Sequence, residues 1–443
     1  MSNYKPFVLG ATALVLTTVA VTGAGLHYSQ SKAYITNSPK EVVDEVWYVI
    51  NKEYVDATFN QHDWREVRKE YLKKDYAEPE QAYEAIREML ALLDDPYTRF
   101  MPPEDFENMQ IDTSGELTGV GIQIAKDKDT DEVVVIAPIE ETPAFEAGIM
   151  AKDVVVAVDG NPTADMDLND VVNLIRGQRG TKVELTIRRD EKVMKFNIVR
   201  EVIQIHPVEA RVDTNAIGDI GYIRLTQFSA QATGEMREAI ADLEKKNVSA
   251  YILDLRSNPG GLLYASIDIA QMWLDGGGIV STVNRVGEVD RQEAVKGKAM
   301  TDKPLVVLVD GGSASASEIL SGALQDNKRA VLVGTNTFGK GLVQSVRRLG
   351  DDSGMVVTIA KYLTPAGRDI NKEGIAPDFV VELDEKVQEE LQADRTKIGT
   401  MQDPQYAKAI NILADELKTG KIPPAENPQA REQQFTQVKK PTN

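Results

Sequence analysis

Two glycine-flanked segments contain the side chains that could act in catalysis. Residues 311–318 include three serines, at positions 313, 315 and 317, and residues 338–341 hold Lys340 between two glycines. A serine nucleophile needs a nearby base to take its proton. The chain has three histidines, and none of them lies beside a candidate serine: His27, His62 and His206. If one of the serines is a nucleophile, Lys340 is therefore the expected base.

The serine-rich segment lies between a predicted strand, 305–309, and a predicted helix that begins at Ala316. Ser315 is then close to a helix N-terminus, where backbone N–H groups lack intrahelical partners. Such groups suit a nucleophile whose attack creates an oxyanion. A plain strand-to-helix turn with a serine cap is the alternative. Spacing alone leaves Ser313 and Ser317 as competing nucleophiles.

Lys340 follows the predicted strand 330–333, and the glycines beside it let the backbone bend and the side chain point inward. Burial would lower the pKa of the lysine, and a neutral amine can accept a serine proton. A solvated loop lysine is the alternative. Residues 334–341 also match a P-loop as far as the lysine, but Gly341 stands where the magnesium-binding Ser or Thr is needed. Nucleotide binding is therefore disfavoured.

A third loop, 256–261, follows the apolar strand 251–255 and contains two adjacent glycines. Their N–H groups could complete an oxyanion hole together with the N–H of Ala316, and a plain tight turn is the alternative. The histidines are scattered and the chain has no cysteine. The sequence therefore supports no metal site, and we expect no cofactor.

These loops need a scaffold that brings strand ends together. From about residue 221 to residue 360 the pattern alternates strand, loop and helix, which indicates a mostly parallel sheet with its loops at one edge. Residues 37–104 are typical of amphipathic helices, and residues 112–200 of short strands with turns. Past residue 383 the chain becomes polar, with one helix expected at 406–418 and a mobile tail from residue 422.

The small β-rich module contains a candidate peptide-binding loop. Residues 117–125 alternate, and the glycine-rich loop of Gly119, Val120, Gly121 and Ile122 lies at the start of an alternating strand. Their backbone N–H groups could hold a C-terminal carboxylate while the strand edge pairs with an extended peptide. A glycine-containing β-turn is the alternative.

Arg176 ends the predicted helix of this module. It could gate activity by contacting either the bound carboxylate or the rest of the protein. A solvated arginine that simply favours the helix dipole is at least as consistent with the pattern.

The N-terminus and the charge balance bear on location and partners. An uncharged run at residues 7–25, followed by a small-x-small pattern at 31–33, predicts a removable secretory signal, and an uncleaved anchor is the alternative. Either one places the remaining chain outside the cytoplasm. The net charge of −19 argues against nucleic-acid binding. The lack of cysteine predicts a fold without disulfides.

Five motifs, in this order, resemble those of the carboxyl-terminal processing peptidases, also called tail-specific proteases. They are residues 94–100, 119–122, 254–261, 312–318 and 337–344. The resemblance implies an α/β (α+β) multidomain fold, in which a PDZ domain is inserted into a Clp-protease/crotonase-like protease core with flanking helical segments. The implied division is 1–33 signal peptide or N-terminal anchor, 37–110 helical N-terminal segment, 111–202 PDZ domain, 203–384 serine protease core and 385–443 helical and mobile C-terminal segment.

The resemblance also implies a role for each matching residue. Ser315 is implied as the nucleophile, Lys340 as the general base, and Gln344, one helical turn further on, as support for the lysine. Asp326, in the helix after the serine, is implied to have a supporting role. The implied oxyanion donors are the N–H groups of Gly261, which is preferred, Gly260 and Ala316.

The segment 54–60, with Asp63 and Trp64 after it, looks most like the cyanobacterial and chloroplast branch of the family. That branch implies the periplasm or the thylakoid lumen, and its substrates include the precursor of a photosystem II reaction-centre subunit. The expected protein is an exported serine endopeptidase that captures apolar C-termini in its PDZ domain and removes C-terminal extensions with a Ser–Lys dyad. A non-catalytic exported PDZ chaperone is the alternative. Signal cleavage, hence membrane proximity, and the oligomeric state stay open.

Overall fold

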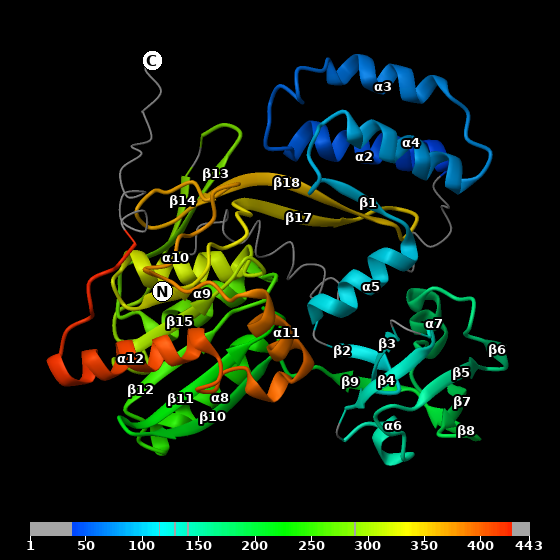
Figure 1. Cartoon of the computed structure of the whole chain (residues 1–443). Helices are drawn as coiled ribbons and strands as arrows, with labels where there is room; N and C mark the ends of the chain where they lie inside the picture. The colour runs from blue at the N-terminus through cyan, green and yellow to red at the C-terminus, as the bar shows by residue number, and fades with distance from the viewer. Residues whose placement is uncertain (1–37, 115, 128–129, 140, 288, 428–443) are drawn as a thin grey trace, which may run out of the picture. The chain divides into compact units, whose positions relative to one another are not determined.

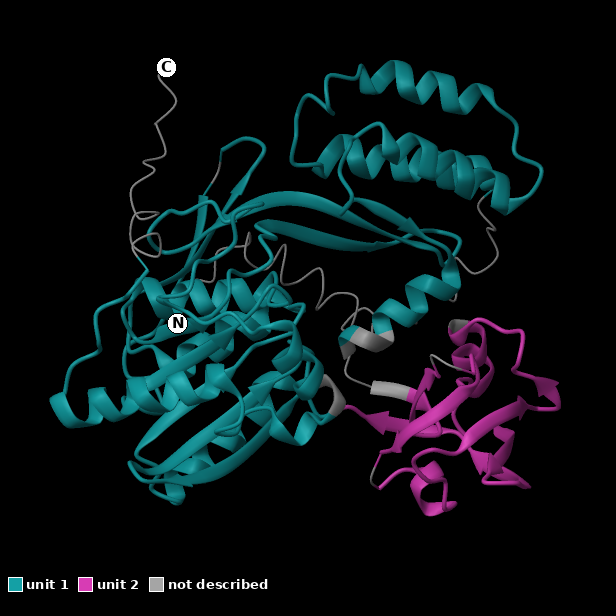
Figure 2. Cartoon of the chain, in the orientation of Figure 1, with its two compact units in different colours: residues 1–113, 206–443 teal, residues 114–205 magenta. Residues whose placement is uncertain are grey.

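The computed structural model describes residues 38–427, except 115, 128–129, 140 and 288. The predicted signal or anchor and most of the predicted mobile tail lie outside the described residues. The chain forms two compact units, one of residues 114–205 and one of residues 1–113 with 206–443 (Figure 2). Among the helices of the described range, none has the length and apolar content of a bilayer-spanning segment.

The N-terminal helices pack on a strand of the larger unit. The elements of this region are α2 (Pro39–Glu53), α3 (Trp64–Lys73), α4 (Pro79–Ala91), β1 (Arg99–Met101) and α5 (Pro103–Ser114) (Figure 1). Prolines occupy the first turns of α2 and α4, where the missing N–H costs no helical hydrogen bond. The apolar faces of α2, α3 and α4 form one buried cluster with Met355 and Val357. Both residues belong to β18 (Gly354–Leu363), which also pairs with β1.

A six-stranded sheet forms the centre of the larger unit. Its strands, in spatial order, are β10 (Val208–Asn215), β11 (Gly218–Leu225), β12 (Ala250–Asp254), β15 (Leu305–Val309), β16 (Val331–Gly334) and β19 (Phe379–Val380). All neighbours from β11 to β19 pair in parallel, as expected for strands that alternate with helices. Every residue of β12 and β15 is buried, which explains their nearly continuous apolar sequences.

Helices cover both faces of this sheet. They are α8 (Ala232–Lys245), α9 (Leu263–Trp273), α10 (Ala316–Asp326) and, after α11 (Glu385–Ala393) and the short η1 (Arg395–Lys397), α12 (Pro404–Thr419). Side chains of α8, α9 and α10 share a buried cluster with Leu253 and Val307. Those of α12 share another with Ile252 and Val306. Successive strand residues point to opposite faces, so each strand contributes to both clusters.

A second, antiparallel sheet packs on α9 and α10. Its strands are β1, β18, β17 (Leu342–Arg348), β13 (Gly278–Asn284) and β14 (Val289–Glu293). Val280 of β13, Val343 of β17 and Tyr362 of β18 belong to the same buried cluster as α10. The second sheet therefore lies next to the helix that follows Ser315.

The smaller unit, Ser114–Ile205, is a β-rich module. Its main sheet has the order β3 (Ile122–Lys126), β4 (Val133–Pro138), β5 (Val154–Val158), β7 (Lys182–Arg189) and β8 (Lys192–Val199), and β6 (Asn161–Pro162) pairs with β5. The other elements are β2 (Glu116–Gly119), which pairs with β9 (Glu201–Gln204), and the helices α6 (Pro143–Glu146) and α7 (Leu168–Ile175). The alternating stretch 117–125 contains the two strands β2 and β3, because the chain bends at Gly121, which has a φ of 82°, and the loop 119–122 leads into the start of β3.

Candidate active site

The loops that follow β12, β15 and β16 meet at one edge of the central sheet, because the carboxyl ends of parallel strands share an edge. The loops are hydrogen-bonded to one another. The N–H of Ala314 donates to the carbonyl of Asn258 (3.0 Å), and the N–H of Phe338 donates to the carbonyl of Ser313 (3.0 Å). The structure thus brings the glycine, serine and lysine loops together.

Ser315 differs from the other two serines of its loop. The hydroxyl of Ser313 donates to the carbonyl of Leu255 (2.9 Å), and that of Ser317 donates to the carbonyl of Asn258 (2.9 Å). Both residues are fully buried, whereas Ser315 is partly exposed at the N-cap of α10. Its backbone has φ 56° and ψ −111°. Few non-glycine residues adopt such a conformation, and those that do are concentrated at functional sites.

Gly260 brings the backbone of its loop directly against the serine segment, and Gly261 brings it against Phe228. A Cβ on Gly260 would lie 2.9 Å from both the nitrogen of Ala316 and the Cβ of Ser315. A Cβ on Gly261 would lie 2.3 Å from the carbonyl oxygen of Phe228. The N–H of Gly260 donates to the Asn258 side chain (2.9 Å). Within the described residues, the N–H groups of Gly261 and Ala316 have no acceptor.

Lys340 is half-buried, and its Nζ lies 5.1 Å from the ring centre of Tyr97. Burial lowers the pKa of the Lys340 amine below its ordinary value, and the Arg99 guanidinium lowers it further. The carboxylates of Glu318 and Asp95 oppose this shift. An amine with a lowered pKa is neutral over a wider pH range and can then accept a proton.

Glu318 ties the serine and lysine loops together. Its fully buried carboxylate accepts hydrogen bonds from the N–H groups of Ser315 (2.8 Å), Gly339 (2.8 Å) and Lys340 (2.9 Å). The Thr337 hydroxyl donates to it as well (2.6 Å). The sequence reasoning missed this residue. Its only signal was a glutamate three positions after a helix-capping serine, which predicts a contact with the Ser315 N–H alone.

Tyr362 of β18 is a second residue that the sequence reasoning missed. Its buried hydroxyl donates to the carbonyl of Lys340, and the same phenolic oxygen accepts a hydrogen bond from the Ser315 side chain. Burial holds the pKa of the Tyr362 phenol well above its ordinary value, so it stays protonated. The phenol therefore contacts both members of the predicted Ser–Lys pair.

Gln344 lies on strand β17, so its predicted position one helical turn after the lysine is wrong. The β17 residues pair with β18, where Gln344 lies opposite Thr358 next to a register shift. The pairing of β17 with β18 places Gln344 in a strand, although its spacing of four residues from Lys340 is also compatible with a helix. The Nε2 of Gln344 is buried and has no hydrogen-bond partner within the described residues.

Asp326 lies at the far end of α10, so the structure does not bring it to the three loops. Eleven residues of helix separate it from Ser315 by roughly 16 Å. Its carboxylate forms a buried ion pair with Arg368 and accepts from the N–H of Ala366 (2.9 Å). Asp326 therefore holds the turn after β18, and any support that it gives to the site is indirect.

The predicted peptide-binding loop of the smaller unit joins β2 to β3. The carbonyl of Val120 accepts from the N–H of Ala144 (2.8 Å), and that of Gly121 accepts from the N–H of Ile139 (2.9 Å). β3 is the last strand of its sheet and pairs with β4 on one side. Arg176 is the C-cap residue of α7. Its gating role stays a prediction.

Comparisons with known proteins identify the family of this chain. The sequence profile of Peptidase family S41 matches residues 219–381, and that of the PDZ domain matches residues 134–189. A carboxyl-terminal-processing protease of Picosynechococcus is 43% identical, over 93% of this chain and 97% of the relative. A chloroplastic C-terminal processing peptidase of Tetradesmus obliquus is 39% identical over 77% of each chain.

Solved structures agree. A photosystem II D1 C-terminal processing protease is 38% identical with a TM-score of 0.54, over 78% of this chain and 94% of that one. The predicted resemblance and the predicted α/β fold, with a peptidase core and a PDZ domain, are confirmed. Among the described residues, no group of acidic or histidine side chains could hold a metal ion. The chain therefore belongs to peptidase family S41, among the carboxyl-terminal-processing proteases that include cyanobacterial and chloroplast members.

Proposed function

We propose that this protein is an exported serine endopeptidase that removes C-terminal extensions from protein substrates with a Ser315–Lys340 dyad. One observation carries the proposal. The buried Glu318 carboxylate accepts from the N–H groups of both Ser315 and Lys340, so a partly exposed serine at a helix N-terminus and a half-buried lysine share one anchor. The cyanobacterial and chloroplastic relatives support export to the periplasm or the thylakoid lumen.

In the proposed reaction, the neutral Lys340 amine takes the proton of the Ser315 hydroxyl as its Oγ attacks the scissile carbonyl. The carbonyl π electrons move to oxygen, and the N–H groups of Gly261 and Ala316 stabilise the oxyanion. The Lys340 ammonium then protonates the leaving amine as the C–N bond breaks. Water then attacks the acyl carbon as the same lysine takes its proton, and the lysine gives that proton to the Oγ of Ser315 as the ester C–O bond breaks.

Substrate capture is proposed to occur in the smaller unit. The N–H groups of the loop 119–122 would hold the terminal carboxylate, and the substrate backbone would pair along the open side of β3. The solved relative is named as a processing protease of photosystem II D1. A precursor of that class, with an apolar C-terminus, is therefore the substrate that we propose.

The experiment compares a tailed peptide with the same peptide carrying a C-terminal amide, with products followed by mass spectrometry. The wild type should cut both upstream of the tail. The amide should raise KM roughly 10-fold or more at similar kcat, because a charge-assisted hydrogen-bond set contributes about 1.5–3 kcal/mol to binding. Equal KM values would contradict carboxylate capture. Binding without any cleavage would favour the non-catalytic PDZ chaperone.

Glu318→Gln offers a test of the shared anchor. The N–H groups of Ser315 and Lys340 share Oε2 of Glu318, and the Gly339 N–H and the Thr337 hydroxyl share Oε1. The amide keeps only one acceptor oxygen, so one of these two pairs of donors loses its acceptor. We expect kcat to fall roughly 10- to 100-fold at nearly constant KM, since small misplacements of reacting groups have effects of this size. Asp326→Asn, at the other end of the same helix, should lower the thermal midpoint while leaving kcat near the wild-type value. A lowered kcat in Asp326→Asn together with a wild-type kcat in Glu318→Gln would contradict the role of Glu318 as the shared anchor.

A further inference from the structure

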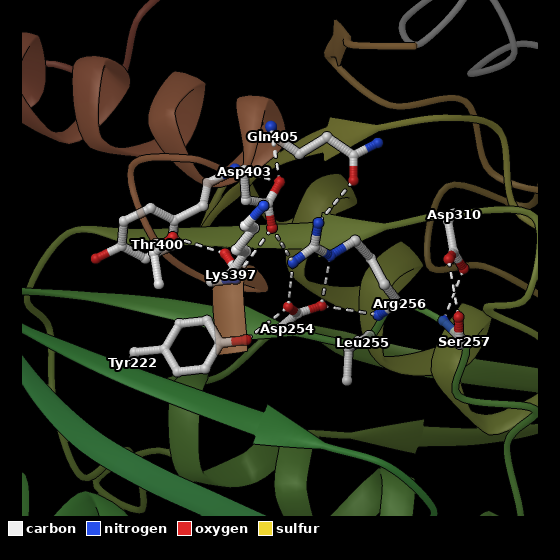
Figure 3. A network of polar contacts seen from close by, with 12 residues as sticks. Tyr222, Asp254, Leu255, Arg256, Ser257, Asp310, Lys397, Thr400, Asp403 and Gln405 are labelled. Atoms are coloured by element: carbon white, nitrogen blue, oxygen red, sulfur yellow. Dashed lines mark hydrogen bonds and ion pairs between the residues drawn. The ribbon is translucent and has the colours of Figure 1, made fainter. Parts of the chain in front are cut away.

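A buried charge network lies at the start of the glycine loop, around Arg256 (Figure 3). Its centre is Arg256, two residues after the end of β12. The guanidinium Nε donates to Oδ1 of Asp254 (2.9 Å), and Nη2 contacts Oδ2 of Asp254 (2.5 Å) and Oδ2 of Asp403 (2.8 Å). Nη1 donates to Oε1 of Gln405 (2.9 Å).

The network is almost completely removed from water. The side chains of Asp254, Arg256 and Asp403 are 1%, 10% and 0% exposed. Although burial alone would lower it, the pKa of Arg256 is held well above its ordinary value by the two carboxylates, so the guanidinium stays charged. Removing one partner of such a group leaves an uncompensated buried charge, to which the structure must adjust. Asp403 is therefore coupled to the position of Arg256.

Arg256 begins the loop that carries the oxyanion donors. The next residue, Ser257, donates its N–H to Oδ1 of Asp310 (2.8 Å), and the Asn258 carbonyl accepts from the Ala314 N–H (3.0 Å). Gly261 follows three residues later. A shift of Arg256 is therefore transmitted through a short, hydrogen-bonded segment to the N–H that faces the reacting carbonyl.

Asp403 itself is held in a rigid setting. Its Oδ1 caps α12 by accepting from the N–H of Gln405 (3.1 Å), and its Oδ2 accepts from the N–H of Gly399 (3.0 Å). Gly399 has a φ of 68°, and a Cβ there would lie 2.7 Å from the hydroxyl oxygen of Tyr222. That hydroxyl donates to Asp254 (2.7 Å), which closes the network. Gly399, Asp403 and Gln405 lie beyond the family match, which ends at residue 381.

We propose that Asp403 is a positioning residue, which through Arg256 holds the loop 255–261 so that the Gly261 N–H points at the oxyanion. The C-terminal segment 399–405 is then part of the catalytic apparatus, although it contributes no atom that touches the substrate. This inference rests on the proposed serine-protease function.

The test uses the full chain and Asp403→Asn, which keeps the size of the side chain and one capping oxygen but removes the charge. We expect kcat to fall roughly 10- to 100-fold with KM within about twofold, since a displacement of about 1 Å can reduce the rate by this much. Asp384→Asn is the matched control, because Asp384 caps α11 by accepting from the N–H of Val387 (2.8 Å) and is exposed. It should leave both constants unchanged.

A peptide aldehyde separates positioning from general stability. Ser315 adds to the aldehyde carbon, and the resulting oxygen anion needs the same N–H donors as the reaction. In Asp403→Asn the inhibition constant of the aldehyde should rise in parallel with the loss of kcat, while the Kd of the matching product peptide stays the same. Unchanged aldehyde affinity, or an equal loss for both ligands, overturns the inference.

If Asp403→Asn does not fold, Gln405→Met serves as the second test of the positioning role. It removes the hydrogen bond that the charged Arg256 guanidinium donates to Oε1 of Gln405 and should reduce kcat and aldehyde affinity roughly 10-fold, the lower end of the value for a hydrogen bond to a charged group. Wild-type values in this variant overturn the inference. A wild-type protein that cleaves no peptide refutes the proposed function instead, so the two failures are distinguishable.

Discussion

Replacing Ser315 by alanine is expected to reduce kcat for tail cleavage by roughly 10⁶-fold, as expected when a serine nucleophile is removed. The substitution removes one oxygen from a partly exposed N-cap residue, so the fold and the binding of product peptides should be retained. The measurement is single-turnover cleavage of a tailed peptide, with the circular dichroism spectrum and the peptide Kd as checks on folding and binding.

The neighbouring serines provide matched controls. Ser313→Ala and Ser317→Ala each remove a buried hydroxyl that donates to a backbone carbonyl. Each should lower the free energy of unfolding by about 0.5–1.5 kcal/mol, the net value of one hydrogen bond, because each carbonyl keeps a backbone N–H donor. Their kcat should stay within about tenfold of the wild type. Cleavage that survived in Ser315→Ala but not in Ser313→Ala would show that the nucleophile is misassigned.

The positions of the glycine, serine and lysine loops were predictable, because the sequence patterns that indicate them lie within a few residues of each loop. Buried parallel strands such as β15 have nearly continuous apolar sequences, and the glycines after them mark where the chain leaves the sheet. The topology rule for parallel strands then places successive loops at one edge. From these facts alone, a serine at the start of α10 and a lysine after β16 are expected to lie close together.

The groups that tune and hold the site were not predictable, because they come from distant parts of the chain. Tyr97 and Arg99 reach Lys340 from the N-terminal region, and Tyr362 arrives on a strand of the second sheet. Local patterns do not encode the pairing of that sheet. For the same reason, the predicted helical position of Gln344 is wrong, and the residue lies on β17 of that sheet. Asp403 carried only the signal of a helix cap.

Replacing Lys340 by alanine is expected to reduce kcat about 10⁴-fold or more, since the general base and the general acid are lost together. In the wild type, kcat/KM should rise with pH as the amine loses its proton. The midpoint should lie below the ordinary lysine pKa of about 10.4, because burial disfavours the ammonium. In Lys340→Ala this rising limb should disappear. Near-normal turnover in the variant would refute the dyad.

Arg99→Gln tests whether the positive charge of Arg99 lowers the pKa of Lys340. Arg99 lowers the pKa of Lys340 by charge repulsion, so its removal should raise that pKa and move the rising limb to higher pH. At neutral pH the activity should fall, and at high pH it should return to the wild-type plateau, because the lysine, the serine and the oxyanion donors are unchanged. A lower activity at every pH would instead mean that Arg99 acts by positioning. The direction of the pH shift thus tests whether burial and a distant arginine together make the lysine a base.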